Sequence, residues 1–303
     1  MKPPAIFLTA EWNWLAMLNY EVAPEILAPS VPAGTELDTW QGKHLVSMVG
    51  FLFQKTRVRG IPIPFHRNFE EVNLRFYVRR KVAGEWRRGV VFIKELVPHF
   101  AIAWVARTFY NENYVTLPMS HRIENVGELL EEGSISRTSS PSPPKKEERA
   151  GVRRPNVSIQ NPESSNPLSP ALSPLRRGEG VEAPEGIKSV RYGWRFDGEE
   201  NYLTLTTRGG PVPIRDGTED EFITEHYWGY AAQQDGSTVE YHVDHPRWRV
   251  WETASATLHC DVAGLYGERF GQYLNGQPSS AFLAEGSAVK VFNGSRLVPE
   301  KRI

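Results

Sequence analysis

The segment Glu71–Arg79 (EVNLRFYVR) alternates apolar and polar residues along its whole length. Successive side chains of a β-strand point to opposite faces, so this period of two predicts a strand with one buried face. The other face is expected to meet either solvent or a cavity. Gly84 then marks a hairpin turn into a second strand over Gly89–Leu96. The chain is therefore expected to build antiparallel sheet around these two segments.

Short strand-like runs recur on both sides of the middle of the chain. They are Leu45–Phe53 with a bulge expected at Gly50, Ser189–Phe196, Tyr202–Thr207, Thr238–Val243, Trp248–Leu258 and Ser279–Phe292, the last divided into a hairpin by Gly286. The dipeptide Asp197-Gly198 is a strong hairpin signal between two of them. These runs predict a mainly β (α+β) fold, with residues 1–303 forming one antiparallel β domain.

A few short helices are expected beside the strands. The apolar spacing in Trp12–Leu27 suits one or two amphipathic helices interrupted near Pro24. A helix is also predicted from Pro98 onward, in the segment that ends at Tyr114, and another over Asp261–Leu274. Thr218 and Glu221 form a capping-box pattern ahead of a helix over Glu219–His226.

The composition changes abruptly between Gly133 and Ile187, where Ser, Pro, Arg, Glu and Gly dominate. Such a segment cannot bury enough apolar surface to offset the entropy of ordering it, so it is predicted to be a disordered insertion. Its PLSPALSPLRRGEG core resembles a translated bacterial repeat element inserted at a loop. Its basic residues leave open a second interpretation, an arm that binds another protein. In either case the two strand-rich halves should pair with each other.

Composition and motifs exclude several classes of protein. The net charge is −1, which gives no overall field that attracts nucleic acid or an anionic membrane. No apolar run approaches the roughly 20 residues of a membrane span, and no convincing secretory signal is found, so a cytoplasmic location is expected. A single cysteine, Cys260, excludes an internal disulfide. Dinucleotide, P-loop and G-x-S-x-G patterns are missing, so no cofactor is predicted, and the oligomeric state is left open.

Three histidines lie close together in the sequence: His226, His242 and His245. In an extended chain His242 and Asp244 share one face and His245 lies on the other, so these residues alone do not assemble a metal site. No metal is therefore predicted. The three rings are expected to be packing residues, with His245-Pro246 ending a strand.

Candidate binding residues fall in two places. The polar face of the first strand offers Glu71, Asn73 and Arg75, which would form an anion-orienting group if that face lines a cavity. An ordinary solvated strand face is the competing interpretation. The second place is the polar, aromatic end of the segment after Pro98, with Arg107, Tyr110 and Tyr114. A buried Arg107 would need a carboxylate partner, for which Glu71 and Glu112 are the candidates.

Three motifs carry a resemblance to a known family: FEEVNLRFYVRR (69–80), GVVFIKELVPHFAIAWVARTFYNENY (89–114) and FITEHYWGYAAQQDGSTVEYHVDHPRW (222–248). They resemble the YqjF-like family of uncharacterised bacterial proteins, the domain of unknown function 2071. This family is similar at the fold level to acetoacetate decarboxylase. The resemblance implies an antiparallel, cone-shaped β-barrel that encloses a small-molecule cavity.

The same resemblance can be followed residue by residue. The decarboxylase motif G-R-E-x-x-G-x-P-K matches the run 106–114, in which Arg107 keeps the arginine and Tyr114 stands at the Schiff-base lysine position. Phe69-x-Glu71 corresponds to that enzyme's Y-x-E. Without an amine at Tyr114 an iminium cannot form there, which argues against Schiff-base decarboxylation. Lys94 is the nearest upstream amine, but it lies in the preceding strand.

The resulting hypothesis is a cavity that binds a small carboxylate-bearing organic molecule. Its ligand-binding candidates are Arg75, Arg107, Tyr110 and Asn73, with Glu71 orienting the arginines and Tyr114 donating a hydrogen bond. A second hypothesis is a lyase or hydrolase on the same barrel, with Glu71 as base and Tyr114 as acid. A third is a non-catalytic interaction protein that uses the basic insertion. The sequence leaves open whether the protein is an enzyme.

Overall fold

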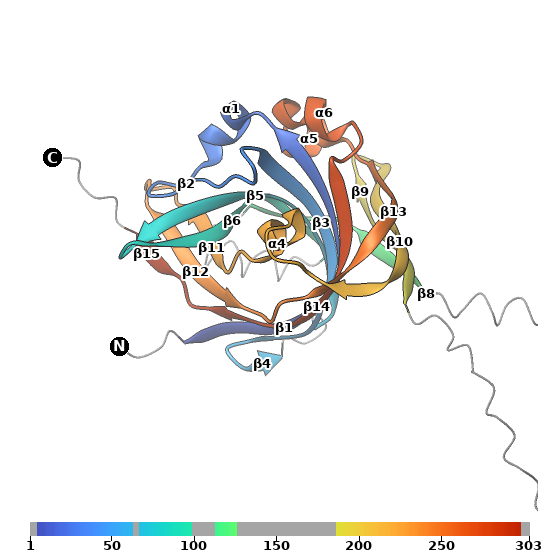
Figure 1. The fold of residues 1–303 in the computed structure, drawn as a ribbon, viewed down its shortest axis with the longest axis horizontal. Coiled ribbons are helices and arrows are strands. Elements are labelled where there is room, and N and C mark those ends of the chain that lie inside the picture. The colour runs from blue at the N-terminus through green and yellow to red at the C-terminus, as the bar shows by residue number, and fades with distance from the viewer. Residues whose placement is uncertain (1–4, 63–66, 99–112, 126–185, 298–303) are drawn as a thin grey trace, which may run out of the picture. The chain divides into compact units, whose positions relative to one another are not determined.

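The computed structural model describes residues 5–62, 67–98, 113–125 and 186–297, and Figure 1 shows their arrangement. The strands are β1 (Ile6–Val22), β2 (Glu36–Leu37), β3 (His44–Val58), β4 (Ile61–Pro62), β5 (Phe69–Val82), β6 (Glu85–Val97), β7 (Tyr114–Thr116), β8 (Met119–Asn125), β9 (Ile187–Phe196), β10 (Glu199–Pro213), β11 (Trp228–Ala232), β12 (Thr238–Asp244), β13 (Arg249–His259), β14 (Ser280–Phe292) and β15 (Ser295–Leu297). The helices are α1 (Pro24–Leu27), η1 (Ala28–Ser30), α4 (Glu219–Thr224), α5 (Val262–Tyr266) and α6 (Glu268–Leu274).

Hydrogen bonding joins the strands into one sheet in the order β15-β12-β11-β6-β5-β3-β1-β14-β13-β10-β9-β8. An additional pairing joins β12 to β14, two strands that are distant in this order. The pairings therefore form a closed circuit, which runs from β12 through β11, β6, β5, β3, β1 and β14 and back to β12. The two halves of the chain meet in this circuit where β11 pairs with β6 and where β1 pairs with β14, which confirms that the two halves pair. Most pairings are antiparallel, but β6 pairs in parallel with β11 and with β7.

The alternating segment forms β5 as predicted, and its two faces differ as expected. Val72, Leu74, Phe76 and Val78 are fully buried in a large apolar cluster. The β5–β6 hairpin turns at Ala83 and Gly84, whose φ angles of 50° and 94° are those of a two-residue hairpin turn with a left-handed backbone. The hairpin between β9 and β10 turns in the same way at Asp197 and Gly198.

The predicted helix over residues 12–22 is wrong, because this segment is part of strand β1. β1 pairs with β3 on one side and β14 on the other, and its residues 15–20 are all buried. A strand covered on both faces carries a continuous apolar run, which hides the period of two. Only Pro24–Leu27 is helical, with Pro24 in the first turn where its missing N–H costs nothing.

The predicted bulge at Gly50 is instead on the partner strand. Between Asn13↔Leu52 and Ala16↔Gly50, β1 has one extra residue, and Trp14 there has a φ of 58°. Gly50 is required for another reason. A Cβ atom on Gly50 would lie 2.6 Å from the ring of Tyr192, so the strand approaches this ring closely.

Gly286 does not divide the last strand into a hairpin, because β14 runs unbroken from Ser280 to Phe292. Gly286 lies opposite Asn13 of β1 and has a φ of 84°. A Cβ atom at this position would lie 1.9 Å from the backbone oxygen of Trp12. A glycine is therefore needed here because β1 and β14 approach each other closely, and the chain does not reverse direction at this residue.

The helices cover and connect the sheet. Thr218 caps α4 as predicted, accepting a hydrogen bond from the backbone N–H of Glu221 at 3.4 Å. The segment predicted as one helix after Asp261 is divided into α5 and α6 at Gly267, which has a φ of 99°. Figure 1 shows α1, α5 and α6 close together, and Arg269 of α6 donates to Ser30 of η1 at 2.9 Å.

Two buried carboxylates hold the basic end of the β5–β6 hairpin. Glu240 of β12 contacts Arg80 at 3.2 Å and Arg87 at 2.5 Å. Asp38, which follows β2, accepts from Nε of Arg88 at 2.7 Å. A buried carboxylate needs such partners, so three of the arginines in this hairpin are engaged in structural ion pairs.

Several predictions fall on residues outside the described ranges, including the helix after Pro98 and most of the insertion. Ile187, predicted as the last residue of the insertion, belongs to strand β9. In the described residues, none of the helices has the length and apolar character to span a membrane. Cys260 is partly buried against the main apolar cluster and its thiol is unbridged.

Candidate functional site

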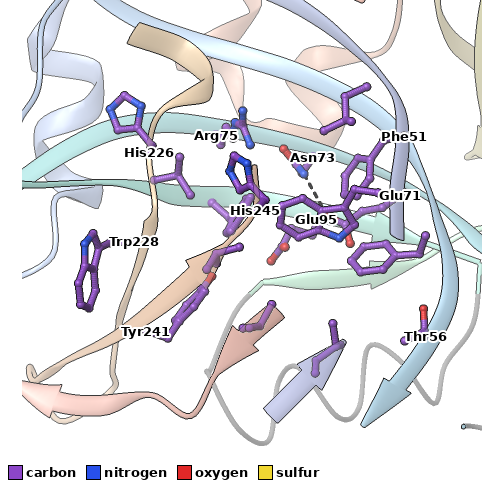
Figure 2. A pocket seen from close by; sticks show the side chains of 18 of the residues that line it. Phe51, Thr56, Glu71, Asn73, Arg75, Glu95, His226, Trp228, Tyr241 and His245 are labelled. Carbon is purple, nitrogen blue, oxygen red and sulfur yellow. Dashed lines mark hydrogen bonds between the residues drawn. The ribbon is translucent and has the colours of Figure 1, made fainter. Parts of the chain in front are cut away.

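A cavity of about 130 Å³ lies against the polar face of β5 (Figure 2). Its walls come from β1, β3, β5, β6, α4 and the segment around β12, and most of them are aromatic or aliphatic. Trp12, Phe51, Phe53, Phe69, Phe92 and Trp248 are among these apolar residues. A mostly apolar cavity with a few convergent polar groups is the usual form of a small-molecule site.

The polar face of β5 enters this cavity. Glu71, Asn73 and Arg75 line it, and Glu71 and Asn73 are only 3% and 1% exposed. These are the alternate residues of the strand, opposite the face that packs into the core. The prediction that this strand has one polar face and one core face is therefore confirmed, and the polar face is buried at Glu71 and Asn73.

Glu71 is held by two donors. Nδ2 of Asn73 donates to Oε1 of Glu71 at 3.0 Å, the dashed line in Figure 2. The hydroxyl of Tyr114 lies 3.5 Å from Oε2 of Glu71, at the limit of a hydrogen bond. Tyr114 is the first residue of β7, which pairs in parallel with β6 and places Tyr114 beside Glu95. The two candidate catalytic residues, Glu71 and Tyr114, are thus in contact.

Arg75 has few contacts of its own in the described part of the chain. Its Nη2 lies 3.8 Å from the sulfur of Met17, and its guanidinium is 5.9 Å from the centre of the Tyr77 ring. Its Nε has no hydrogen-bond partner among the described residues, and the same holds for Oδ1 of Asn73. A donor and an acceptor are therefore left unsatisfied at a cavity, where a ligand could satisfy both.

A bulge in β6 decides which side chain of this strand faces the cavity. The register passes from Leu74↔Lys94 to Arg75↔Phe92, so Ile93 is an extra residue. Phe92 and Glu95 consequently both line the cavity. Lys94 points away from it, because its ammonium donates to the carbonyl of Leu265. Burial lowers the pKa of Lys94. Among the described residues, no lysine lines the cavity.

Two histidines that the sequence suggested as packing residues also line the cavity. His226 follows α4, and its Nε2 lies 3.4 Å from Oδ2 of Asp38, which is long for a hydrogen bond. Burial, assisted by the nearby charges of Arg88 and Arg75, lowers the pKa of His226 to about 4 despite Asp38.

His245 follows β12, and His242, three residues earlier, is outside the cavity. The signal for this difference was present in the sequence, because an extended chain places His242 and His245 on opposite faces. In the described part of the chain, no group of three or more metal-ligating side chains is found.

The remaining predicted binding residues, Arg107 and Tyr110, lie outside the described residues, as does the possible partner Glu112. Glu95 is the buried acid that the sequence analysis missed. It is 1% exposed and lines the cavity beside the β5 face. No pattern in the sequence alone reveals the bulge that turns it inward.

Solved structures of other proteins share this fold. Acetoacetate decarboxylase from Legionella pneumophila aligns with a TM-score of 0.56 at 11% identity, over 98% of this chain and 89% of that one. An acetoacetate decarboxylase-like enzyme from Sphingomonas wittichii aligns with a TM-score of 0.55 at 11% identity, over 96% and 93%. The enduracididine biosynthesis enzyme MppR, solved with pyruvate, aligns with a TM-score of 0.53 at 12% identity, over 99% and 93%. The fold is acetoacetate decarboxylase-like.

The chain belongs to the family DUF2071, described as an uncharacterized conserved protein, whose model matches residues 9–288. The uncharacterized protein YqjF of Bacillus subtilis is 34% identical over 114 residues. That alignment covers 37% of this chain and 46% of YqjF, a little under half of its length. The resemblance inferred from the three sequence motifs is therefore confirmed.

Proposed function

We propose that the cavity binds a small organic acid, and that Arg75 holds its carboxylate. The observation that carries this proposal is the Arg75 guanidinium in a mostly apolar cavity, with Nε unsatisfied among the described residues. A guanidinium binds carboxylates through its fork of N–H donors, and an apolar environment strengthens that contact. Asn73, Arg107 and Tyr110 would complete the site.

The size of the cavity supports a ligand of few atoms. A volume of about 130 Å³ is close to that of an engineered cavity that holds benzene, so about six non-hydrogen atoms would fit. Pyruvate, which MppR binds, has this size and carries a carboxylate. Small 2-oxo acids are therefore the ligand class that we propose.

In this proposal, the strands before and after the insertion 133–187 form one domain. The circuit of pairings from β12 to β14 and back supports the predicted barrel around the cavity. Tyr114 stands where the decarboxylase has its lysine, and Lys94 is turned toward Leu265. The proposed function is accordingly binding without a Schiff base.

Substitution of Arg75 by alanine should abolish the thermal stabilisation that pyruvate gives to the wild-type protein. Loss of a charge-assisted contact in an apolar site is expected to raise the Kd about 30-fold or more. The measurement is a thermal-shift titration, because a ligand raises the melting temperature only by binding the folded state. Arg79→Ala is the matched control. Arg79 lies on the same face of β5 but forms a surface ion pair with Glu36, so pyruvate should still stabilise this variant.

Equal stabilisation of Arg75→Ala and wild type by pyruvate would exclude the proposed role of Arg75. A folded wild-type protein that responds to no small carboxylic or oxo acid would instead favour the third hypothesis, an interaction protein that uses its insertion.

A lyase or hydrolase is the second candidate function, and the 3.5 Å contact between Tyr114 and Glu71 favours it. In this function Glu71 removes a proton and Tyr114 returns one to the leaving group. Glu71→Gln keeps the size of the side chain but removes the base, so it should lower any lyase or hydrolase turnover by at least about 100-fold. Turnover that is unchanged in Glu71→Gln would rule out Glu71 as the base.

A further inference from the structure

His245 lies between the cavity and the surface of the protein. It lines the cavity together with Arg75, and it also lines an outer groove with Lys55, Arg57 and Pro246. Nδ1 of His245 is 3.0 Å from the carbonyl oxygen of Pro246. A carbonyl oxygen can only accept, so Nδ1 carries the proton in this contact and Nε2 of the neutral ring keeps its lone pair.

The lone pair of His245 is available. Nε2 has no hydrogen-bond partner among the described residues, although His245 is only 8% exposed. Pro246, whose carbonyl oxygen lies against Nδ1, lines the groove and not the cavity, whereas His245 lines both. Burial lowers the pKa of His245, against the hydrogen bond to Pro246 and the charges of Glu225 and Asp244, which raise it, and the charge of Arg75 lowers it further. The net lowering favours the neutral ring.

The ring is held in place by aromatic neighbours. It stacks on Trp248 with the centroids 4.2 Å apart and the planes 16° apart, and Tyr227 lies 4.8 Å away. Arg75 also lines the cavity, as Figure 2 shows, and its charge acts on the His245 ring. A fixed base next to an anion-binding group is the arrangement that proton transfer from a bound acid requires.

Glu71 is less suited to this role than His245. Its carboxylate is already engaged by Asn73 and Tyr114. His245 has an unengaged lone pair, and it lines both the cavity and a groove on the surface. A base that borders both spaces can exchange its proton with water between turnovers.

We propose that His245 is a catalytic base and that the protein enolises the small 2-oxo acid held by Arg75. Nε2 removes a proton from the carbon next to the carbonyl. The electron pair of that C–H bond forms a C=C bond, and the carbonyl π electrons move to oxygen, where Arg75 stabilises the enolate. Return of a proton from Nε2 to carbon restores the oxo acid, so the cycle needs no oxidant or reductant. This inference rests on the proposed function.

The test is hydrogen–deuterium exchange of pyruvate with the full-length protein in D₂O. Loss of the methyl signal in ¹H NMR measures the exchange rate, after subtraction of the rate without protein. Wild type should accelerate exchange, and His245→Gln should lower the protein-dependent rate by about 100-fold or more. His242→Gln is the matched control, because His242 lies on the adjoining strand β12 outside the cavity. It should exchange pyruvate at the wild-type rate.

Thermal-shift titration of the same proteins with pyruvate separates the two proposals. Stabilisation of wild type and His245→Gln with exchange in wild type alone supports both. Stabilisation without exchange in wild type, or equal exchange in His245→Gln, overturns the role of His245 and leaves binding intact. No stabilisation of wild type by pyruvate overturns both.

A second variant covers the case in which His245→Gln does not fold. His245→Ala leaves a space beside Trp248 that imidazole fits, so added imidazole should restore exchange to this variant while leaving His242→Gln unaffected. A folded His245→Ala protein that imidazole does not rescue, and that still exchanges pyruvate at the wild-type rate, would also overturn the proposal.

Discussion

Replacement of Gly286 by alanine is expected to lower the free energy of unfolding by about 3 kcal/mol or more. Gly286 has a φ of 84°, a backbone conformation that costs other residues energy, and its Cβ would lie 1.9 Å from the backbone oxygen of Trp12. Backbone cannot move aside as a flexible side chain does, so β1 and β14 would have to separate. Urea unfolding at neutral pH measures the change.

The control for this substitution is Gly210→Ala. Gly210 is also a strand glycine, in β10, and no atom lies within 4 Å of its built Cβ. Its unfolding free energy should change by less than about 1 kcal/mol. A Gly286→Ala protein as stable as Gly210→Ala would show that the close contact between β1 and β14 can relax, and would contradict the argument.

Acidification from pH 7 to pH 4 is expected to remove about 3 kcal/mol of stability through His226. Burial is the main cause that lowers the pKa of His226 to about 4, from 6.5 in the unfolded chain. Between these two values the unfolded chain binds a proton that the folded protein does not bind. Stability therefore rises with pH across this window and is lost as the pH falls from 6.5 to 4.

Asp38 adds a loss at lower pH. Burial alone would raise its pKa, but the contacts with His226 and Arg88 lower it to about 2, from 3.8 in the unfolded chain. A depressed carboxyl pKa stabilises the fold above 3.8, and that stability is lost as the pH falls toward 2. Both groups thus make the protein sensitive to acid, in two successive windows.

Urea unfolding of wild type and His226→Gln at several pH values between 7 and 4 tests this prediction. The variant should lose most of the pH dependence between 6.5 and 4. His259→Gln, at an exposed site at the end of β13, should retain it. A wild-type protein with constant stability across this range would contradict the buried, neutral state of His226.

The part of the site on β5 could be predicted because it depends on local periodicity. One strand carries Glu71, Asn73 and Arg75 on one face, and the alternation of EVNLRFYVR places them there without any knowledge of the partner strands. His226, His245 and Glu95 could not be assigned in this way. They reach the cavity through pairings between distant segments, such as β6 with β11 and β12 with β14.

Local patterns in the sequence predicted the features that depend on neighbouring residues: the alternation of β5, the hairpin turns at Gly84 and at Asp197-Gly198, and the cap at Thr218. Other features depend on contacts between distant segments and follow only from the folded chain. β1 is a strand because β3 and β14 cover it, and Gly286 is needed because β1 approaches it. The bulge at Ile93 turns Glu95 rather than Lys94 into the cavity. The physical reason is that strand pairing sets register and burial between residues far apart in the chain, and a local pattern contains neither.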